Sequence, residues 1–403
     1  METTQHDSPY SWWRLALSLA LSIVGSIGIW APIVVLADMQ ADFGVTRAAA
    51  SFPYTLTMVG FAAGNLLLGR VVDRKGMAPV LGGSALALAL GFGGSALTQS
   101  VTAITALHVF VGAGAAACFG PLMADISLWF HRRRGIAVAV VASGNYLAGA
   151  FWPPIMVWVM ESADGWRSAY LMLAVVVFLV LLPGATLLRS RIDAASTDFA
   201  AREAAANATA TGVSPRTLQA LLALAGIGCC VAMAMPQVHI VALCIDRGYG
   251  AQSGAQMLSL MLLGGVASRL AFGAFVDRFG GLMTLFAGGT LQMLTLCLFL
   301  LDGGLTTLYL SALIFGLSQG GIVPSYAIIV REYMAPQEAG KRVGLVIGAT
   351  ILGMALGGWM AGWIYDTSGS YRLAVWNGIA WNVLNISIAL ILLTRIGPRR
   401  APA

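Results

Sequence analysis

One arginine, Arg269, stands in an apolar segment, Gly254 to Val276, that is long enough to cross a lipid bilayer. A permanent cation at membrane depth costs roughly 2.5–3.5 kcal/mol on insertion scales, so its presence calls for a reason. A planar guanidinium is the preferred bidentate partner of a carboxylate. The residues one turn away, Gly265 and Gly273, are small and leave room for an anion. The segment therefore predicts an organic-anion site; the alternative is a structural arginine held by carbonyls or by an acid on another helix.

The composition predicts the scaffold that must position this arginine. The chain has 403 residues, of which 58% are hydrophobic and only 10% are charged, whereas a soluble domain is about 25% charged. The 48 glycines suit closely packed membrane helices. The five cysteines lie in apolar segments without a CxxC pair, which is typical of small buried side chains. We expect an all-α membrane protein.

Apolar segments between polar breaks predict twelve transmembrane helices. The first, about 12–36, is too long for the apolar region of a signal peptide and is expected to remain as a span. The other spans are about 48–69, 78–98, 102–130, 135–160, 167–188, 217–245, 252–276, 281–301, 304–331, 342–365 and 371–394. The charged, Ala/Thr/Ser-rich segment 189–216 separates two halves, an N-terminal bundle at 1–188 and a C-terminal bundle at 217–403.

Basic residues are distributed unevenly among the predicted loops. With both termini on one side of the membrane, that side carries eighteen basic residues, including Arg14 and the triplet Arg132–Arg134, and the other side carries four. Cytoplasmic loops carry the excess of Arg and Lys, so both termini are predicted to be cytoplasmic. Arg269 is the one basic residue left within a span. Because the basic residues form no single patch, the net charge of +6 does not indicate nucleic-acid binding.

The two halves share a loop pattern, Gly-x-x-x-Asp-Arg-x-Gly. It occurs at Gly69–Gly76, after the second predicted helix, and at Gly273–Gly280, after the eighth, with an offset of 204 residues. An internal repeat of a six-helix unit is typical of a transporter with two pseudo-symmetric bundles and a binding site near the bilayer midplane. The residues predicted to form this conformational loop motif are Gly69, Asp73, Arg74, Gly273, Asp277 and Arg278.

Few titratable side chains fall inside the predicted spans. His108, in the fourth, and His239, at the end of the seventh and close to the outer surface, could exchange protons near neutral pH. Each is equally well explained as a hydrogen-bonded core histidine. Asp125 is the only acid within a span, and its place near the cytoplasmic end favours an anchoring role over substrate binding. The histidines are therefore the candidates for proton coupling.

Other polar or aromatic residues within spans are candidates for lining a substrate cavity. A largely apolar pocket with few polar anchors suits a short aliphatic or aromatic acid. Each of these residues, taken individually, is better explained by helix packing than by ligand contact. The predicted substrate-binding residues besides Arg269 are Phe119, Asn145, Tyr146 and Gln319.

The repeated motif resembles the loop between helices two and three of the major facilitator superfamily. Three stretches are more narrowly similar to monocarboxylate transporters and bacterial oxalate/formate antiporters: Asp42–Thr55, Trp129–Gly149 and Ser268–Gly280. In that group the arginine of the eighth helix binds the substrate carboxylate, so the resemblance implies this role for Arg269. The acidic residue that human-type members carry one turn earlier is Gly265 here, and the first-helix lysine is absent. The resemblance therefore supports carboxylate binding more strongly than it supports the family's coupling mechanism.

Together these features predict a proton-coupled secondary transporter of small organic anions, specifically monocarboxylates. The alternatives are an exporter of an amphipathic compound, in which Arg269 is structural, and a membrane sensor that binds a carboxylate without transporting it. Catalytic, cofactor-binding and metal-binding motifs are absent from the sequence, so an enzyme is not expected. The 21 arginines against two lysines indicate a GC-rich bacterial genome, hence the bacterial inner membrane. We expect a monomer whose partners are the bilayer, a small carboxylate and protons.

Overall fold

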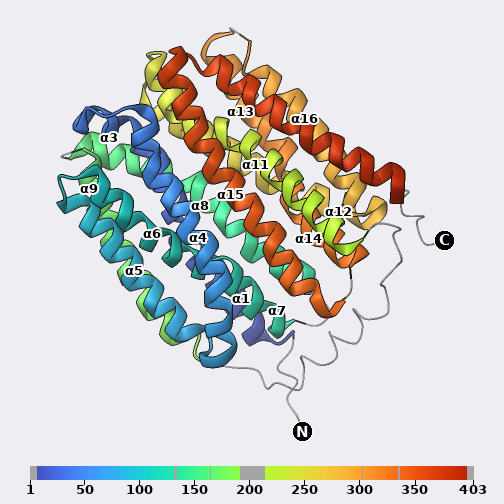
Figure 1. The fold of residues 1–403 in the computed structure, drawn as a ribbon. Helices are drawn as coiled ribbons and strands as arrows, with labels where there is room; N and C mark the ends of the chain where they lie inside the picture. Colours follow the sequence, from blue (N-terminus) through green and yellow to red (C-terminus); the bar gives the residue numbers. More distant parts are fainter. Residues whose placement is uncertain are drawn as a thin grey trace. The chain divides into compact units, whose positions relative to one another are not determined.

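The computed structural model describes residues 7–130, 134–163, 165–190, 214–301, 303–334 and 336–396. Every regular element in these ranges is an α-helix (Figure 1). Within them, eleven helical segments are long and apolar enough to cross a membrane. The second predicted span, 48–69, lies in a helix that is not among those eleven, α4 (Arg47–Lys75), which with 29 residues exceeds the length that a bilayer requires. The predicted all-α membrane fold is confirmed.

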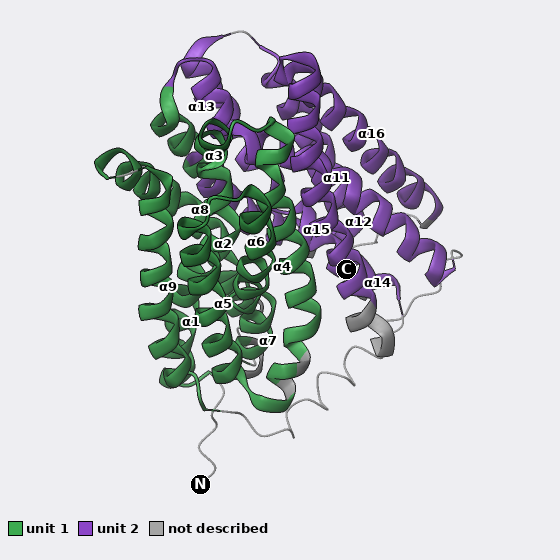
Figure 2. Cartoon of the chain, turned by 60° about the vertical axis from the view of Figure 1, so that its left-hand side comes forward, with its two compact units in different colours: residues 1–197, 250–259 green, residues 198–249, 260–403 purple. Residues whose placement is uncertain are grey.

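The chain divides into two compact units (Figure 2). Unit 1 contains residues Met1–Thr197 and Gly250–Ser259, and unit 2 contains Asp198–Tyr249 and Leu260–Ala403. Most of the predicted linker, 191–213, lies outside the described residues, as do Arg132 and Arg133 of the predicted basic triplet. The boundaries of the two six-helix bundles remain a prediction.

Unit 1 is built on α4 packed against α6, and on α5 packed against both α6 and α9. Hydroxyl side chains begin several of its helices, because a serine or threonine oxygen accepts a hydrogen bond from a first-turn amide. Ser8, Thr46 and Ser100 cap α1, α4 and α6 in this way. The helices are α1 (Pro9–Gly25), α2 (Ile27–Val34), α3 (Leu36–Phe43), α4 (Arg47–Lys75), α5 (Met77–Leu97), α6 (Val101–Ala117), α7 (Gly120–Trp129), α8 (Arg134–Ser162) and α9 (Trp166–Leu187).

Unit 2 has α11 at its centre, in contact with both α15 and α16. Most of the length of α11 is buried, which fits a helix that is apolar on all sides. The helices are α11 (Pro215–Asp246), α12 (Gly250–Leu298), α13 (Gly304–Gln319), α14 (Ile322–Tyr333), α15 (Pro336–Ser368) and α16 (Tyr371–Ile396), of which α12 begins in unit 1.

Three of the predicted spans are interrupted helices, and the first, 12–36, forms α1 and α2 with a break at Ser26. The fourth span forms α6 and α7, separated at Cys118–Phe119, and the tenth forms α13 and α14, separated at Gly320–Gly321. In unit 1, Phe119 departs from helical dihedrals (φ −123°, ψ −93°), and Pro121 restarts the helix within its first turn. Interrupted helices expose backbone groups that a membrane helix otherwise hides, and transporters use them for binding.

One end of unit 1 carries an exposed charge cluster. Arg167, at the start of α9, donates hydrogen bonds to Asp42 in α3 and to Gln99, and Trp166 Nε1 donates to Asp42 Oδ2 over 3.2 Å. The Arg167 guanidinium lowers the pKa of the Asp42 carboxyl below its ordinary value. The cluster joins α3 to α9 and to the loop after α5.

Candidate functional site

Arg269 lies in α12 where this helix presses against the interruption between α13 and α14. The hydroxyl of Ser268 accepts a hydrogen bond from the Gly320 amide over 3.1 Å. A Cβ atom on Gly320 would lie 2.5 Å from the Arg269 backbone nitrogen, so only glycine permits this approach. One turn after Arg269, at Gly273, an added Cβ would meet nothing within 4 Å. The backbone at Arg269 is thus fixed by a close contact between helices, and the space beside the helix is open one turn later, at Gly273.

Gln319, the last residue of α13, has a buried amide group. Gln237 Nε2 in α11 donates to Gln319 Oε1 over 2.8 Å, and the Gln319 side chain is fully buried. Among the described residues, no acceptor lies within hydrogen-bond distance of Gln319 Nε2. An unmade buried donor costs about 1–3 kcal/mol, so a native protein is expected to use it. Gln319 therefore offers a donor to an acceptor ligand, one residue from the backbone contact at Gly320.

The internal repeat extends from the loop motif into the helix packing. Three close approaches between α4 and α6 recur, 204 residues later, between α12 and α13. In each case a small residue allows one helix to touch the backbone or Cβ of the other. The matching pairs are Thr57–Gly112 with Met261–Gly316, Gly60–Val109 with Gly264–Leu313, and Gly64–Ala116 with Ser268–Gly320.

This register makes Asn65 the counterpart of Arg269, and the two residues differ in chemistry. Asn65 Oδ1 accepts a hydrogen bond from the Gly120 amide over 3.1 Å and so satisfies the first amide of α7. At the corresponding place in unit 2, Arg269 can only donate, and the counterpart of Gly120 is Pro324, which has no amide hydrogen. A guanidinium favours an anion as its partner, and so does the N-terminus of a helix such as α14.

The predicted substrate residues of unit 1 lie on α8 and at the interruption before α7. Asn145 and Tyr146 are consecutive on α8 and each is 9% exposed. The Asn145 carbonyl accepts a hydrogen bond from Trp30 Nε1 over 2.9 Å. The Phe119 ring packs against Phe61, with centroids 5.6 Å apart. Unit 2 holds Arg269 and Gln319, so the predicted residues fall into two groups, one within each unit.

Both candidate histidines are fully buried, and both ring nitrogens of each have a partner. His108 Nδ1 lies 2.8 Å from the Ile104 carbonyl, and its Nε2 lies 3.1 Å from the Tyr170 hydroxyl. His239 Nε2 lies 2.8 Å from the Gly358 carbonyl, and its Nδ1 lies 3.0 Å from the Tyr371 hydroxyl. A carbonyl can only accept, so the nitrogen facing it carries the hydrogen. The other nitrogen of a neutral ring then accepts from the tyrosine, as in a structural histidine.

The comparisons with known proteins identify the family. The sequence profile of the Major Facilitator Superfamily matches residues 17–301 and 232–403. This chain belongs to the Major Facilitator Superfamily. Monocarboxylate transporter 13 of Rattus norvegicus is 24% identical over 89% of this chain and 83% of its own length. Monocarboxylate transporter 11 of Homo sapiens is 25% identical over 91% of this chain and 79% of its own length.

Solved structures show the same superfamily fold. A bacterial homologue of the human lysosomal transporter Spinster, in an inward-facing conformation, has a TM-score of 0.74 and covers 96% of this chain and 98% of its own at 12% identity. The nucleoside transporter NupG has a TM-score of 0.67 and covers 94% of this chain and 99% of its own at 14% identity. At these identities the likeness establishes the fold.

The repeated motif is mostly helical, and our expectation of two loops was wrong. Gly69 and Arg74 lie within α4, and Gly273 and Arg278 lie within α12. The chain turns only at the last glycine of each motif, Gly76 (φ 80°, ψ −179°) and Gly280 (φ 78°, ψ 171°). Glycine is required there because other residues rarely adopt positive φ. The side chains of Asp73 and Asp277 lie outside the described part of the structure.

We counted Arg14 among the basic residues of the cytoplasmic side. In the structure it lies inside a candidate membrane span. Its side chain is fully buried and donates from Nε and Nη2 to the two oxygens of Asp125 in α7, each over 2.9 Å. The guanidinium also lies 4.5 Å from the centre of the Trp129 ring and 3.4 Å from the Leu188 carbonyl. Arg269 is therefore not the only basic residue in a span. The sole acid in a predicted span, Asp125, was the sequence signal that could have found this pair.

Proposed function

We propose that this protein is a proton-coupled secondary transporter of small monocarboxylates that works by alternating access, with Arg269 as the ligand of the substrate carboxylate. One observation carries the proposal: Arg269 replaces, in the internal repeat, the asparagine that caps α7. The residue of unit 2 that corresponds to the acceptor of this contact is therefore a donor. A carboxylate has only acceptor atoms and complements such a donor.

The donors available at this place fit one carboxylate group. The guanidinium can bind both oxygens as a fork, and the N-terminus of α14 contributes its dipole. Gln319 Nε2 is a further buried donor near the same interruption. A free anion in the membrane would be costly to desolvate, but one that meets several fixed donors is stabilised. This arrangement favours carboxylate binding over a structural role for Arg269.

The names of the relatives support the substrate class. Both mammalian proteins described above are named monocarboxylate transporters, and they align with most of this chain. We keep Phe119, Asn145 and Tyr146 as predicted substrate-binding residues, and propose that a largely apolar lining favours short aliphatic or aromatic acids. We further propose the bacterial inner membrane, with both termini cytoplasmic, and a monomer as the working unit.

Proton coupling is assigned to His108 or His239. Each ring accepts a hydrogen bond from a tyrosine hydroxyl, and a hydroxyl can rotate so that it accepts instead. Rotation would allow a protonated ring to keep two partners, since both nitrogens of imidazolium donate. The other route, in which the proton travels on the substrate acid, needs neither histidine.

The test measures binding of benzoate and propionate to purified protein by calorimetry. If Arg269 binds the carboxylate, Arg269→Ala and Arg269→Lys should each lower affinity about ten- to a hundred-fold, the value of a charge-assisted hydrogen bond of roughly 1.5–3 kcal/mol. Lysine fails because it offers a point charge and not a fork. Asn65→Ala, the matched variant in the other half, should retain affinity. Benzamide and propionamide should bind the native protein poorly.

Native-like affinity in Arg269→Ala would show that the cation serves packing, and would favour the exporter of an amphipathic compound. Binding without uptake of labelled acid into proteoliposomes, with or without a pH gradient, would favour a sensor.

A further inference from the structure

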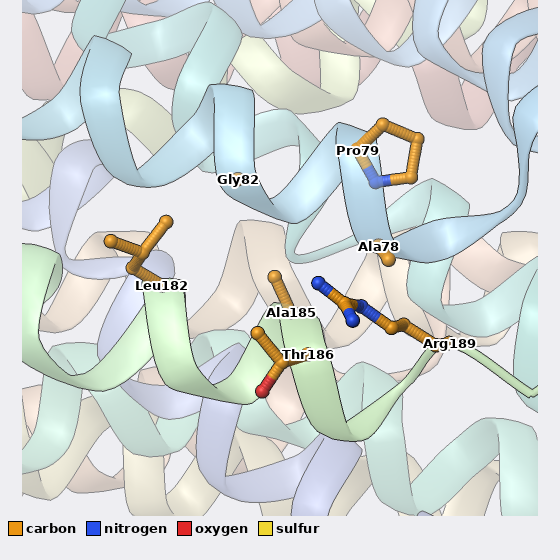
Figure 3. Close-up of a pocket in the computed structure, with 7 residues that line it drawn as sticks. All are labelled: Ala78, Pro79, Gly82, Leu182, Ala185, Thr186 and Arg189. Carbon is orange, nitrogen blue, oxygen red and sulfur yellow. The ribbon is translucent and has the colours of Figure 1, made fainter.

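A groove of about 330 Å³ lies between the first turns of α5 and the last turns of α9 in unit 1 (Figure 3). Its walls are mostly apolar: Ala78, Pro79 and Gly82 come from α5, and Leu182, Ala185 and Thr186 come from α9. A Cβ atom on Gly82 would meet nothing within 4 Å, so the space beside this residue is open. The two helices are in contact along much of their length, and the groove forms where small side chains leave their ends unfilled.

Arg189, just after α9, points into this groove, and its guanidinium lies beside Ala185 and Ala78 (Figure 3). The residue is exposed, and among the described residues no carboxylate lies within ion-pair distance of it. Two further exposed cations, Arg74 and Lys75, end α4 immediately before the turn into α5. The N-terminus of α5 adds the positive end of a 21-residue helix dipole. This end of the groove therefore carries positive charge from Arg189 and from the N-terminus of α5.

The groove opens toward lipid. Both walls belong to candidate membrane spans, Met77–Leu97 and Trp166–Leu187. Large apolar side chains of the same two helices are exposed, among them Leu86 on α5 and Leu179 and Leu182 on α9. Exposed leucines in a membrane span contact acyl chains. An occupant of the groove thus meets hydrocarbon on one side and a cluster of cations at the membrane surface.

We propose that this groove binds an anionic phospholipid, with the lipid phosphate on Arg189 and one acyl chain along the α5–α9 seam. Basic pockets between transmembrane helices at the cytoplasmic surface are suited to anionic lipid headgroups, and this end of the helices is the one that the basic loops predict to be cytoplasmic. A soluble anion would use the guanidinium but would gain nothing from the apolar walls, whereas a phospholipid uses both.

The test is native mass spectrometry of delipidated full-length protein titrated with dioleoyl-phosphatidylglycerol and, separately, with dioleoyl-phosphatidylcholine. The native protein should bind the phosphatidylglycerol more tightly. Arg189→Ala should weaken that binding about ten-fold, since one charge-assisted contact is lost. Arg395→Ala, which removes a cation from the last turn of α16, should leave it unchanged.

A second pair of variants tests the groove itself. Gly82→Leu should fill the space and lower phosphatidylglycerol binding, whereas Gly83→Leu should not, because Gly83 is equally unobstructed but does not line the groove. Equal affinity for the two lipids, retained binding in Arg189→Ala, or equal effects of the two leucine variants would overturn the proposal. So would full competition by inorganic phosphate, because that would make the place a plain anion site.

Discussion

Removing either partner of the Arg14–Asp125 ion pair should destabilise the protein strongly, and removing both should not. Arg14 is fully buried, and two of its nitrogens contact the two carboxylate oxygens at 2.9 Å. Arg14→Met leaves a carboxylate that loses both of these bonds. Asp125→Leu leaves a guanidinium with only the Tyr10 hydroxyl and the Leu188 carbonyl, each at 3.4 Å, and the Trp129 ring.

The size of the expected loss of stability follows from the burial of the ion pair. An uncompensated charge left by breaking a buried pair costs about 3–5 kcal/mol, whereas replacing both partners with apolar side chains of similar volume is often close to neutral. The double variant Arg14→Met/Asp125→Leu should therefore be more stable than either single variant. The resulting coupling energy in a double-mutant cycle should be about 3 kcal/mol or more. Arg167→Met provides the control, because its pair with Asp42 is exposed and should cost about 1 kcal/mol or less.

The assay is reversible unfolding in mixed micelles of dodecylmaltoside and sodium dodecylsulfate, followed by circular dichroism. Additive losses in the double variant would refute the reasoning, since they would show that the two charges do not interact in the folded state. Single-variant losses no larger than that of Arg167→Met would refute it as well, because they would mean that water reaches the pair.

Three further predictions concern packing, pH and coupling. Gly316→Ala should cost about 1–3 kcal/mol, since its methyl group would clash with the α12 backbone, whereas Gly273→Ala should be neutral or stabilising in the same unfolding assay. The lowered pKa of Asp42 means that its ion pair stabilises the fold above the unfolded carboxyl value of about 3.9 and that this stabilisation is lost as the pH falls below it. In Asp42→Asn, the free energy of unfolding should therefore depend less on pH in the acid range. An unchanged pH dependence would contradict this. The double variant His108→Gln/His239→Gln should bind carboxylate but lose accumulation driven by a pH gradient; full accumulation would show that neither histidine carries the proton.

The sequence by itself determined the features that depend on local composition. Long apolar segments must form helices in lipid because their backbone groups have no other partners, so the all-α membrane fold followed directly. The repeated motif and its offset of 204 residues could be found from the amino-acid sequence alone. Arg269 could be recognised from the sequence because a charge in an apolar membrane segment is costly whichever helices surround it.

Only the tertiary structure decided which side chains meet. Arg14 and Asp125 are 111 residues apart, and Gln237 and Gln319 are 82 apart. Their pairing depends on how each helix is rotated about its axis. A helix that is apolar on nearly all sides, such as α11, carries no hydrophobic stripe from which that rotation can be read. The rotation is fixed instead by close approaches at small residues such as Gly316, which involve backbone atoms of a distant helix and leave no local pattern in the sequence.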